Sequence, residues 1–102
     1  MHKRTGHDDR RLDRRIPIGC PALIHLAAGS HVTAKCMEIG VGGMSLHAAY
    51  VPAADEVLDV EVAGPEGGVR QPPLRVRLQV RRCNALGAGL YEIGGAIVRV
   101  VG

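Results

Sequence analysis

Apolar and polar residues alternate in two segments of the chain, residues 57–62 and 74–80. Because successive side chains of a β-strand point to opposite faces, this period of two predicts two strands that are each buried on one face only. The predicted inward side chains are Leu58, Val60, Val62, Leu74, Val76, Leu78 and Val80, and the outward ones are Asp59, Glu61, Arg75, Arg77 and Gln79. Since the outward charges of the two segments are opposite, we expect them to pair across the sheet.

Four other segments are rich in aliphatic and β-branched residues and predict strands at residues 20–26, 32–39, 44–48 and 90–101. Turn-forming segments separate the six strands at residues 27–30, 40–43, 64–68 and 84–89. The only helical candidate is a single turn at residues 52–57. This pattern predicts an all-β fold, a small antiparallel barrel or sandwich, and closure into a six-stranded barrel is favoured because it removes exposed sheet edges.

Composition limits the number of domains and the kinds of residue that can form the core. A length of 102 residues fits one domain with a single core. The chain has neither Phe nor Trp, so the core must be aliphatic, and Tyr50 and Tyr91 are more typical of packing residues than of base-stacking platforms. The three cysteines, Cys20, Cys36 and Cys83, are odd in number and widely spaced, which indicates reduced thiols that behave as small buried hydrophobic residues.

The net charge of +3 lies entirely at the start of the chain, where residues 1–15 contain six Lys and Arg against three Asp. Residues 16–102 carry seven charges of each sign. We therefore expect a flexible arginine-rich leader, residues 1–15, ahead of a single barrel domain, residues 16–102. The chain has no apolar run typical of a secretory signal or a membrane span, so we expect a cytoplasmic protein.

The leader arginines cluster at residues 10–15. A guanidinium presents a planar fork of donors that fits phosphate oxygens and the O6/N7 edge of guanine, so this cluster indicates an anionic ligand. A solvated basic tail that only aids solubility is the alternative from charge alone. A second basic stripe, Arg75, Arg77, Arg81 and Arg82, is interpreted as the solvent face of a strand, with nucleic-acid binding as the alternative.

The leader arginines and residues 38–46 together resemble the PilZ domain family, which binds the bacterial second messenger cyclic di-GMP. The family signature begins with RxxxR on the leader, and Arg11 and Arg15, preceded by Arg10, have this spacing. Its second part, [D/N]xSxxG, corresponds to residues 38–43. Residues 90–96 are similar to the last barrel strand of the family, so the resemblance covers nearly the whole chain from Arg10 onward.

The second motif is only partly retained, because Glu38 replaces Asp or Asn and Gly40 replaces Ser, whereas Gly43 matches. The resemblance implies a ligand site at Arg10, Arg11, Arg15, Glu38, Gly40 and Gly43. The arginines would bind phosphate and guanine, and a carboxylate at position 38 would accept the N1 and N2 hydrogens of guanine. The two replacements would weaken binding by about tenfold to a thousandfold. The glycines also fit a turn or bulge that needs positive φ.

By this resemblance we expect a signalling protein that orders its leader on cyclic di-GMP and then presents a surface to an effector of motility, pilus, biofilm or virulence control. One alternative is a PilZ-fold adaptor that does not bind the nucleotide and acts through protein contacts. A second is a small nucleic-acid-binding barrel that uses both basic stripes. We expect neither enzymatic activity nor a metal or cofactor, because the serines, histidines and cysteines lack the spacing of a catalytic or metal site.

Overall fold

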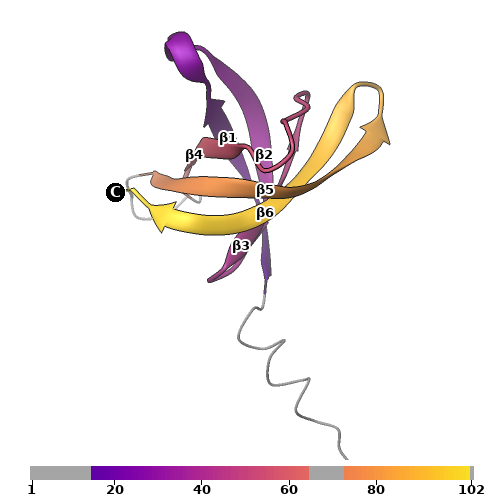
Figure 1. The fold of residues 1–102 in the computed structure, drawn as a ribbon. Coiled ribbons are helices and arrows are strands. Elements are labelled where there is room, and N and C mark those ends of the chain that lie inside the picture. Colours follow the sequence, from indigo (N-terminus) through magenta and orange to yellow (C-terminus); the bar gives the residue numbers. More distant parts are fainter. Residues whose placement is uncertain (1–14, 65–72, 102) are drawn as a thin grey trace, which may run out of the picture.

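The computed structural model describes residues 15–64 and 73–101. The elements are β1 (Ile16–His25), the short 3-10 turn η1 (Ala27–Gly29), β2 (His31–Ile39), β3 (Gly43–Ala48), β4 (Val57–Val62), β5 (Leu74–Gly87) and β6 (Leu90–Val100). All neighbouring strands are antiparallel, and they close into a barrel in the order β1-β2-β3-β6-β5-β4 (Figure 1). The six-stranded antiparallel barrel expected from the sequence is confirmed.

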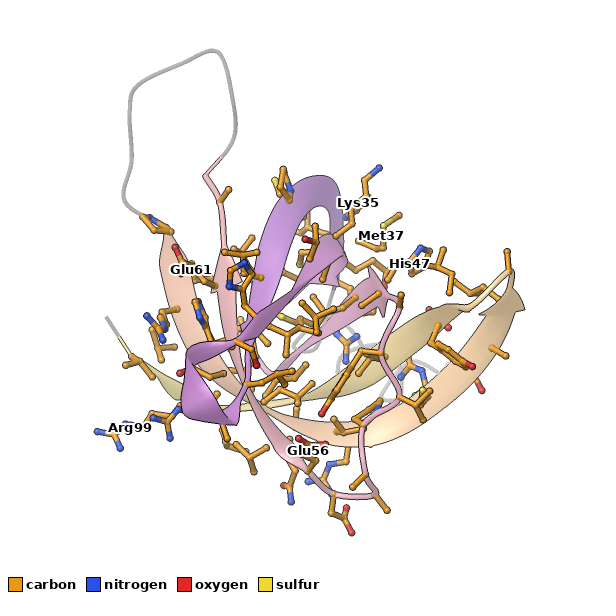
Figure 2. The ribbon with its side chains drawn as sticks, turned by 90° about the horizontal axis from the view of Figure 1, so that it is seen from above. Lys35, Met37, His47, Glu56, Glu61 and Arg99 are labelled. Atoms are coloured by element: carbon orange, nitrogen blue, oxygen red, sulfur yellow. The ribbon has the colours of Figure 1, made fainter. Side chains whose placement is uncertain are left out.

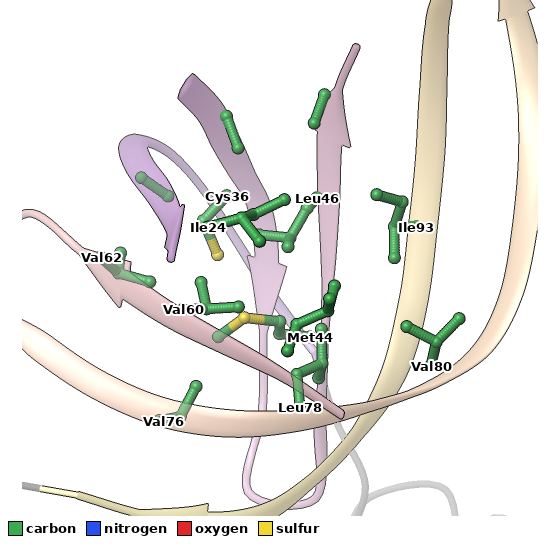
Figure 3. Packing of buried hydrophobic residues seen from close by; sticks show 14 residues of the cluster. Ile24, Cys36, Met44, Leu46, Val60, Val62, Val76, Leu78, Val80 and Ile93 are labelled. Atoms are coloured by element: carbon green, nitrogen blue, oxygen red, sulfur yellow. The ribbon is translucent and has the colours of Figure 1, made fainter. Parts of the chain in front are cut away.

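Aliphatic side chains and one methionine fill the interior of the barrel (Figure 3). The largest buried apolar side chains are Ile24, Met44, Leu46, Leu58, Val60, Val76, Leu78 and Ile93. The inward faces predicted for β4 and β5 are confirmed except at Leu74, which begins β5 and is 36% exposed. Since burying one such side chain stabilises a fold by about 1.5–3 kcal/mol, a core without Phe or Trp still holds the barrel together.

β1 begins at Ile16, four residues earlier than the apolar pattern predicts. A β-bulge between Pro17 and Cys20 keeps this early part of the strand paired with β2. Gly19 lies in the left-handed region at φ +61°, a conformation that glycine adopts without steric cost. The pairing of β1 therefore starts directly after Arg15, and the end of the leader is placed against the barrel.

β5 is also longer than predicted, because it continues to Gly87 instead of turning at residue 84. Gly87, Ala88 and Gly89 all have positive φ, which confines the reversal to a tight connection. The result is a long β5–β6 hairpin that extends beyond the other strands (Figure 1).

The single helical turn expected at residues 52–57 is wrong. The segment is an irregular loop with a turn in which Glu56 N donates to Ala53 O at 3.1 Å and Asp55 has φ 61°. The Glu56 carboxylate also accepts from Tyr50 Oη at 3.0 Å and from the Ala53 amide at 2.9 Å. No helix within the described ranges has the length and apolar character needed to cross a bilayer.

The outward charges of β4 find partners on both neighbouring strands. Asp59 accepts from Arg75 Nε at 2.9 Å and from Arg75 Nη2 at 3.0 Å, a cross-strand pair of the expected kind. These hydrogen bonds lower the pKa of Asp59. Glu61 instead lies 2.8 Å from Nε2 of His25 on β1, a partner that the alternation of charges did not indicate. Figure 2 shows Glu61 on the outside of the barrel.

Candidate functional site

Two consecutive arginines of β5, Arg81 and Arg82, both lie on the outer surface of the barrel. Regular alternation after the buried Val80 would turn one of them inward. Val80 opposes Gly95 and Arg82 opposes Gly94, so Arg81 is the extra residue of a β-bulge. Because a bulge reorients the side chains that follow it, both guanidinium groups reach the same surface.

The Arg82 guanidinium lies directly over Gly94 of β6. A β-carbon placed on Gly94 would be 2.6 Å from Arg82 Cζ, 2.8 Å from Nη1 and 2.9 Å from Nε. Carbon atoms in normal contact are about 3.5–4.0 Å apart, so the arginine occupies the space that any larger residue at position 94 would need. A larger residue at position 94 would therefore displace the Arg82 guanidinium.

Arg15 approaches the adjacent part of the β3–β6 pair. A β-carbon placed on Gly43 would be 2.5 Å from Arg15 Nη2 and 2.7 Å from the carbonyl oxygen of Gly95. The Nε atom of Arg15 is buried and has no hydrogen-bond partner among the described residues. Buried polar atoms are rarely left unpaired, and this donor belongs to a cation, so an anionic oxygen that reached it would gain a strong hydrogen bond.

Glu38, Ser45, Gly94 and Arg82 are successive register partners across β2, β3, β6 and β5. Directly opposed residues of neighbouring strands share one face of the sheet, so these four form an outer row. With strands about 4.8 Å apart, the two charged ends of the row are separated by about 14 Å along the sheet. Ser45 is only 2% exposed although its chain neighbours point into the core. The row thus has an acceptor at one end, a cation at the other and small residues between them.

A second outer row runs beside the first, toward the β5–β6 hairpin. It consists of Lys35, His47, Glu92 and Asn84. Lys35 and His47 extend away from the barrel wall in Figure 2. Because Lys35 and Glu92 have opposite charges, this second row adds no net charge to the surface.

We call the depression between the arginines the arginine cleft; its lining residues are Arg15, Gly42, Arg81, Arg82, Gly95 and Ala96. Three cationic side chains and no acidic one line it, which suits an anion. Its volume is about 180 Å³, whereas sites for whole small molecules measure about 300–1,000 Å³. The described residues therefore provide one wall of a site for a nucleotide-sized ligand.

Larger hollows lie elsewhere on the barrel. The largest, about 570 Å³, is lined by Ile18, Gly19, Cys20, Pro21, Ala34, Lys35 and Gly64. Its lining has one charged side chain, Lys35, and it adjoins residues 65–72, which lie outside the described ranges. The arginine cleft is smaller but carries far more charge, so its chemistry makes it the candidate site.

The glycines of the β2–β3 connection do not have the positive φ that the turn interpretation required. Gly40, Gly42 and Gly43 all lie outside the left-handed region, and Gly40 N donates to Gly43 O at 2.9 Å to close the turn. The glycine at position 43 is explained instead by the backbone carbonyl oxygen of Gly95, which lies 2.7 Å from the position a β-carbon would take and cannot move aside as the Arg15 guanidinium can. The backbone at position 40 permits a residue with a side chain.

The structure brings together only part of the site expected from the sequence. Arg15 and Gly43 lie against each other, and Glu38 lies at the far end of the outer row. Arg10 and Arg11 lie outside the described residues, so their roles stay predictions.

The sequence interpretation placed Arg81 and Arg82 on a solvent-facing stripe and missed their position beside Arg15. The structure divides that stripe, because Arg75 pairs with Asp59 whereas Arg81 and Arg82 line the cleft. Two adjacent charged residues directly after an alternating segment are the signal that was available. They break the period of two and are typical of a bulge.

The thiols do not form a further reactive centre. Cys36 is fully buried, and burial raises its pKa to about 11, so it is protonated at neutral pH. Cys20, its register partner, and Cys83 are partly buried, and all three cysteines are free. Within the described part of the chain, no group of three His, Cys, Asp or Glu side chains is placed to hold a metal ion.

No protein-family model and no curated protein matches the sequence. Among solved structures, the fold is similar to the inhibitor of motility (MotI/DgrA) of Bacillus subtilis, with a TM-score of 0.69 and 14% sequence identity. The similarity covers 99% of this chain and 44% of that chain, so this chain spans less than half the length of its neighbour. At this identity the likeness concerns the fold, and it supports a PilZ-like barrel.

Proposed function

We propose that this protein is a cyclic di-GMP receptor whose site lies over the β3–β6 pair and is completed by the leader. The observation that carries the proposal is the Arg15 guanidinium, which lies against Gly43 and Gly95 with its buried Nε donor unpaired among the described residues. A charged donor gains a short, strong hydrogen bond when a phosphate oxygen binds it. Arg81 and Arg82 add two positive charges to the same cleft.

The sequence supports a cyclic dinucleotide over other anions. Arg11 and Arg15 have the RxxxR spacing of the family that the chain resembles, and the barrel has the corresponding fold. The structural neighbour is named as an inhibitor of motility, so we propose an output in the control of motility or surface attachment.

In this proposal, Glu38 at the end of the outer row recognises guanine. The Glu38 carboxylate accepts the N1 and N2 hydrogens of one guanine. Glu38 is one methylene longer than the family's Asp, and Gly40 provides no hydroxyl. The affinity is therefore expected to lie below that of a domain with the full motif.

The leader supplies the second wall of the site. The arginine cleft holds about 180 Å³, too little for a dinucleotide, and Arg10 and Arg11 are joined to it through Arg15. Ligand binding would fix the leader over the barrel and create a new surface for a protein effector. The effector receives the signal as a change in shape and charge at this end of the barrel.

Isothermal titration with cyclic di-GMP tests the proposal, with linear pGpG and GTP as control ligands. We expect Arg15→Ala to weaken binding by at least tenfold, because a hydrogen bond to a charged group is worth about 1.5–3 kcal/mol. Arg77→Ala is the control variant. It removes an exposed arginine of β5 that does not line the cleft, so this variant should bind cyclic di-GMP like the wild type. Absence of binding by the wild type at high micromolar ligand would favour the adaptor, and tight binding of duplex DNA would favour the nucleic-acid-binding barrel.

A further inference from the structure

We infer that Arg82 is a base-stacking residue of this site, and that a guanine base of the ligand stacks on the outer face of its guanidinium. The inference rests on the proposed function, because it assigns base recognition within the same site. Arg82 belongs neither to the leader motif nor to the motif at residues 38–43. Its role follows from its position over Gly94.

The three distances at Gly94 show how the guanidinium is oriented. If the β-carbon position lay straight above Cζ at the observed 2.6 Å, the bonded nitrogens, about 1.33 Å from Cζ, would be about 2.9 Å away. The values for Nη1 and Nε are 2.8 and 2.9 Å. The guanidinium therefore lies flat on Gly94, with one face against β6 and the opposite face turned outward.

A flat guanidinium with one exposed face is a stacking surface for a purine. Arginine stacks on planar rings through its own plane and its charge, which an ammonium group cannot reproduce in full. No aromatic residue is present among the residues lining the arginine cleft, and Tyr50 is occupied by Glu56. In the described part of the cleft, the Arg82 guanidinium thus provides a flat stacking surface of the kind that an aromatic side chain offers in other sites.

Arg81 is the matched control because it lines the same cleft with the same charge. It is the extra residue of the bulge and has no register partner on β6, whereas Arg82 is held over Gly94. If charge alone mattered, the two arginines would respond alike to substitution. If the plane matters, only Arg82 would be sensitive to a change that keeps the charge.

The experiment compares Arg82→Lys and Arg81→Lys in the full chain by titration with cyclic di-GMP at two salt concentrations. We expect Arg82→Lys to weaken binding about tenfold and Arg81→Lys to weaken it by a clearly smaller factor, because lysine keeps the charge that Arg81 contributes. The salt dependence should be unchanged in both variants, because neither alters the charge. The guanine circular dichroism band of the saturated complex should change in Arg82→Lys only, since it reports stacking.

Gly94→Ala provides an independent test, because the added methyl displaces the guanidinium but leaves it in the protein. It should weaken binding as Arg82→Lys does; if its melting curve shows loss of the fold, the two lysine variants decide. Suppose that the wild type binds cyclic di-GMP, and that the two lysine variants lose affinity to the same extent or neither loses any. Either result would overturn the stacking role and leave the receptor proposal intact. A wild type that does not bind would overturn both.

Discussion

At the scale of single residues, close approach of neighbouring groups accounts for two glycines better than turn chemistry does. Gly43 and Gly94 lie under the guanidinium groups of Arg15 and Arg82, and neither has positive φ. The sequence revealed that position 43 matches a motif, but not why a side chain is excluded there, because the reason is the close backbone of Gly95 on the neighbouring strand β6. Gly40 is different, since its backbone tolerates a side chain.

Restoring the two altered motif positions should strengthen binding, and the backbone of Gly40 does not need the positive φ that would strain a serine there. We expect Glu38→Asp combined with Gly40→Ser to tighten cyclic di-GMP binding by about ten- to a hundredfold, because the shorter carboxylate and the added hydroxyl restore two contacts. Titration together with a melting curve measures both effects. The single variant Glu38→Asp separates the two contributions. Unchanged affinity in a normally folded double variant would mean that neither side chain touches the ligand.

At the scale of elements, alternation predicted the inward faces of β4 and β5 because period-two patterning directly reflects burial. The bulges at Arg81, Gly19 and Met37 were not predictable in this way. A bulge is defined by the register against a neighbouring strand, and one strand's pattern does not contain that register. The site depends on these irregular positions, which is why the fold was predicted more completely than the cleft.

The β4–β5 pair gives a prediction that is independent of the ligand. Arg75 holds the pKa of Asp59 below its ordinary value, so this stabilisation is present above about pH 4 and is lost as the pH falls through the lowered pKa of the folded state. Asp59→Asn should therefore have a lower melting temperature than the wild type at pH 6, and the difference should shrink toward zero near pH 2.

Thermal melts across this pH range measure the effect of Asp59→Asn. Glu92→Gln is the control, because Glu92 forms no ion pair with another residue of the described ranges. The effect of the control should be smaller at pH 6. A difference between Asp59→Asn and the wild type that persists unchanged at the lowest pH would contradict the role assigned to the Arg75 pair.

At the scale of the whole molecule, the distribution of charge divides the chain into a basic leader and an electrically balanced barrel. Two of the seven cationic residues of the balanced part, Arg81 and Arg82, lie beside the end of the leader at Arg15. An anion bound there would be attracted by both parts and would reduce the repulsion between them. Binding and the position of the leader should therefore be coupled.

Limited trypsin digestion tests this coupling. Cleavage after Arg10 and Arg11 should slow about tenfold when free cyclic di-GMP is ten times its dissociation constant, because only the unbound fraction would expose these bonds. Cleavage after Arg70 serves as an internal control, since this residue does not belong to the leader. Arg15→Ala, with binding at least tenfold weaker, should reduce this protection to about twofold or less at the same ligand concentration. Equal cleavage of the leader in the free protein and in the saturated complex would show that the ligand binds the barrel without engaging the leader, and the effector surface would then have to lie on the barrel itself.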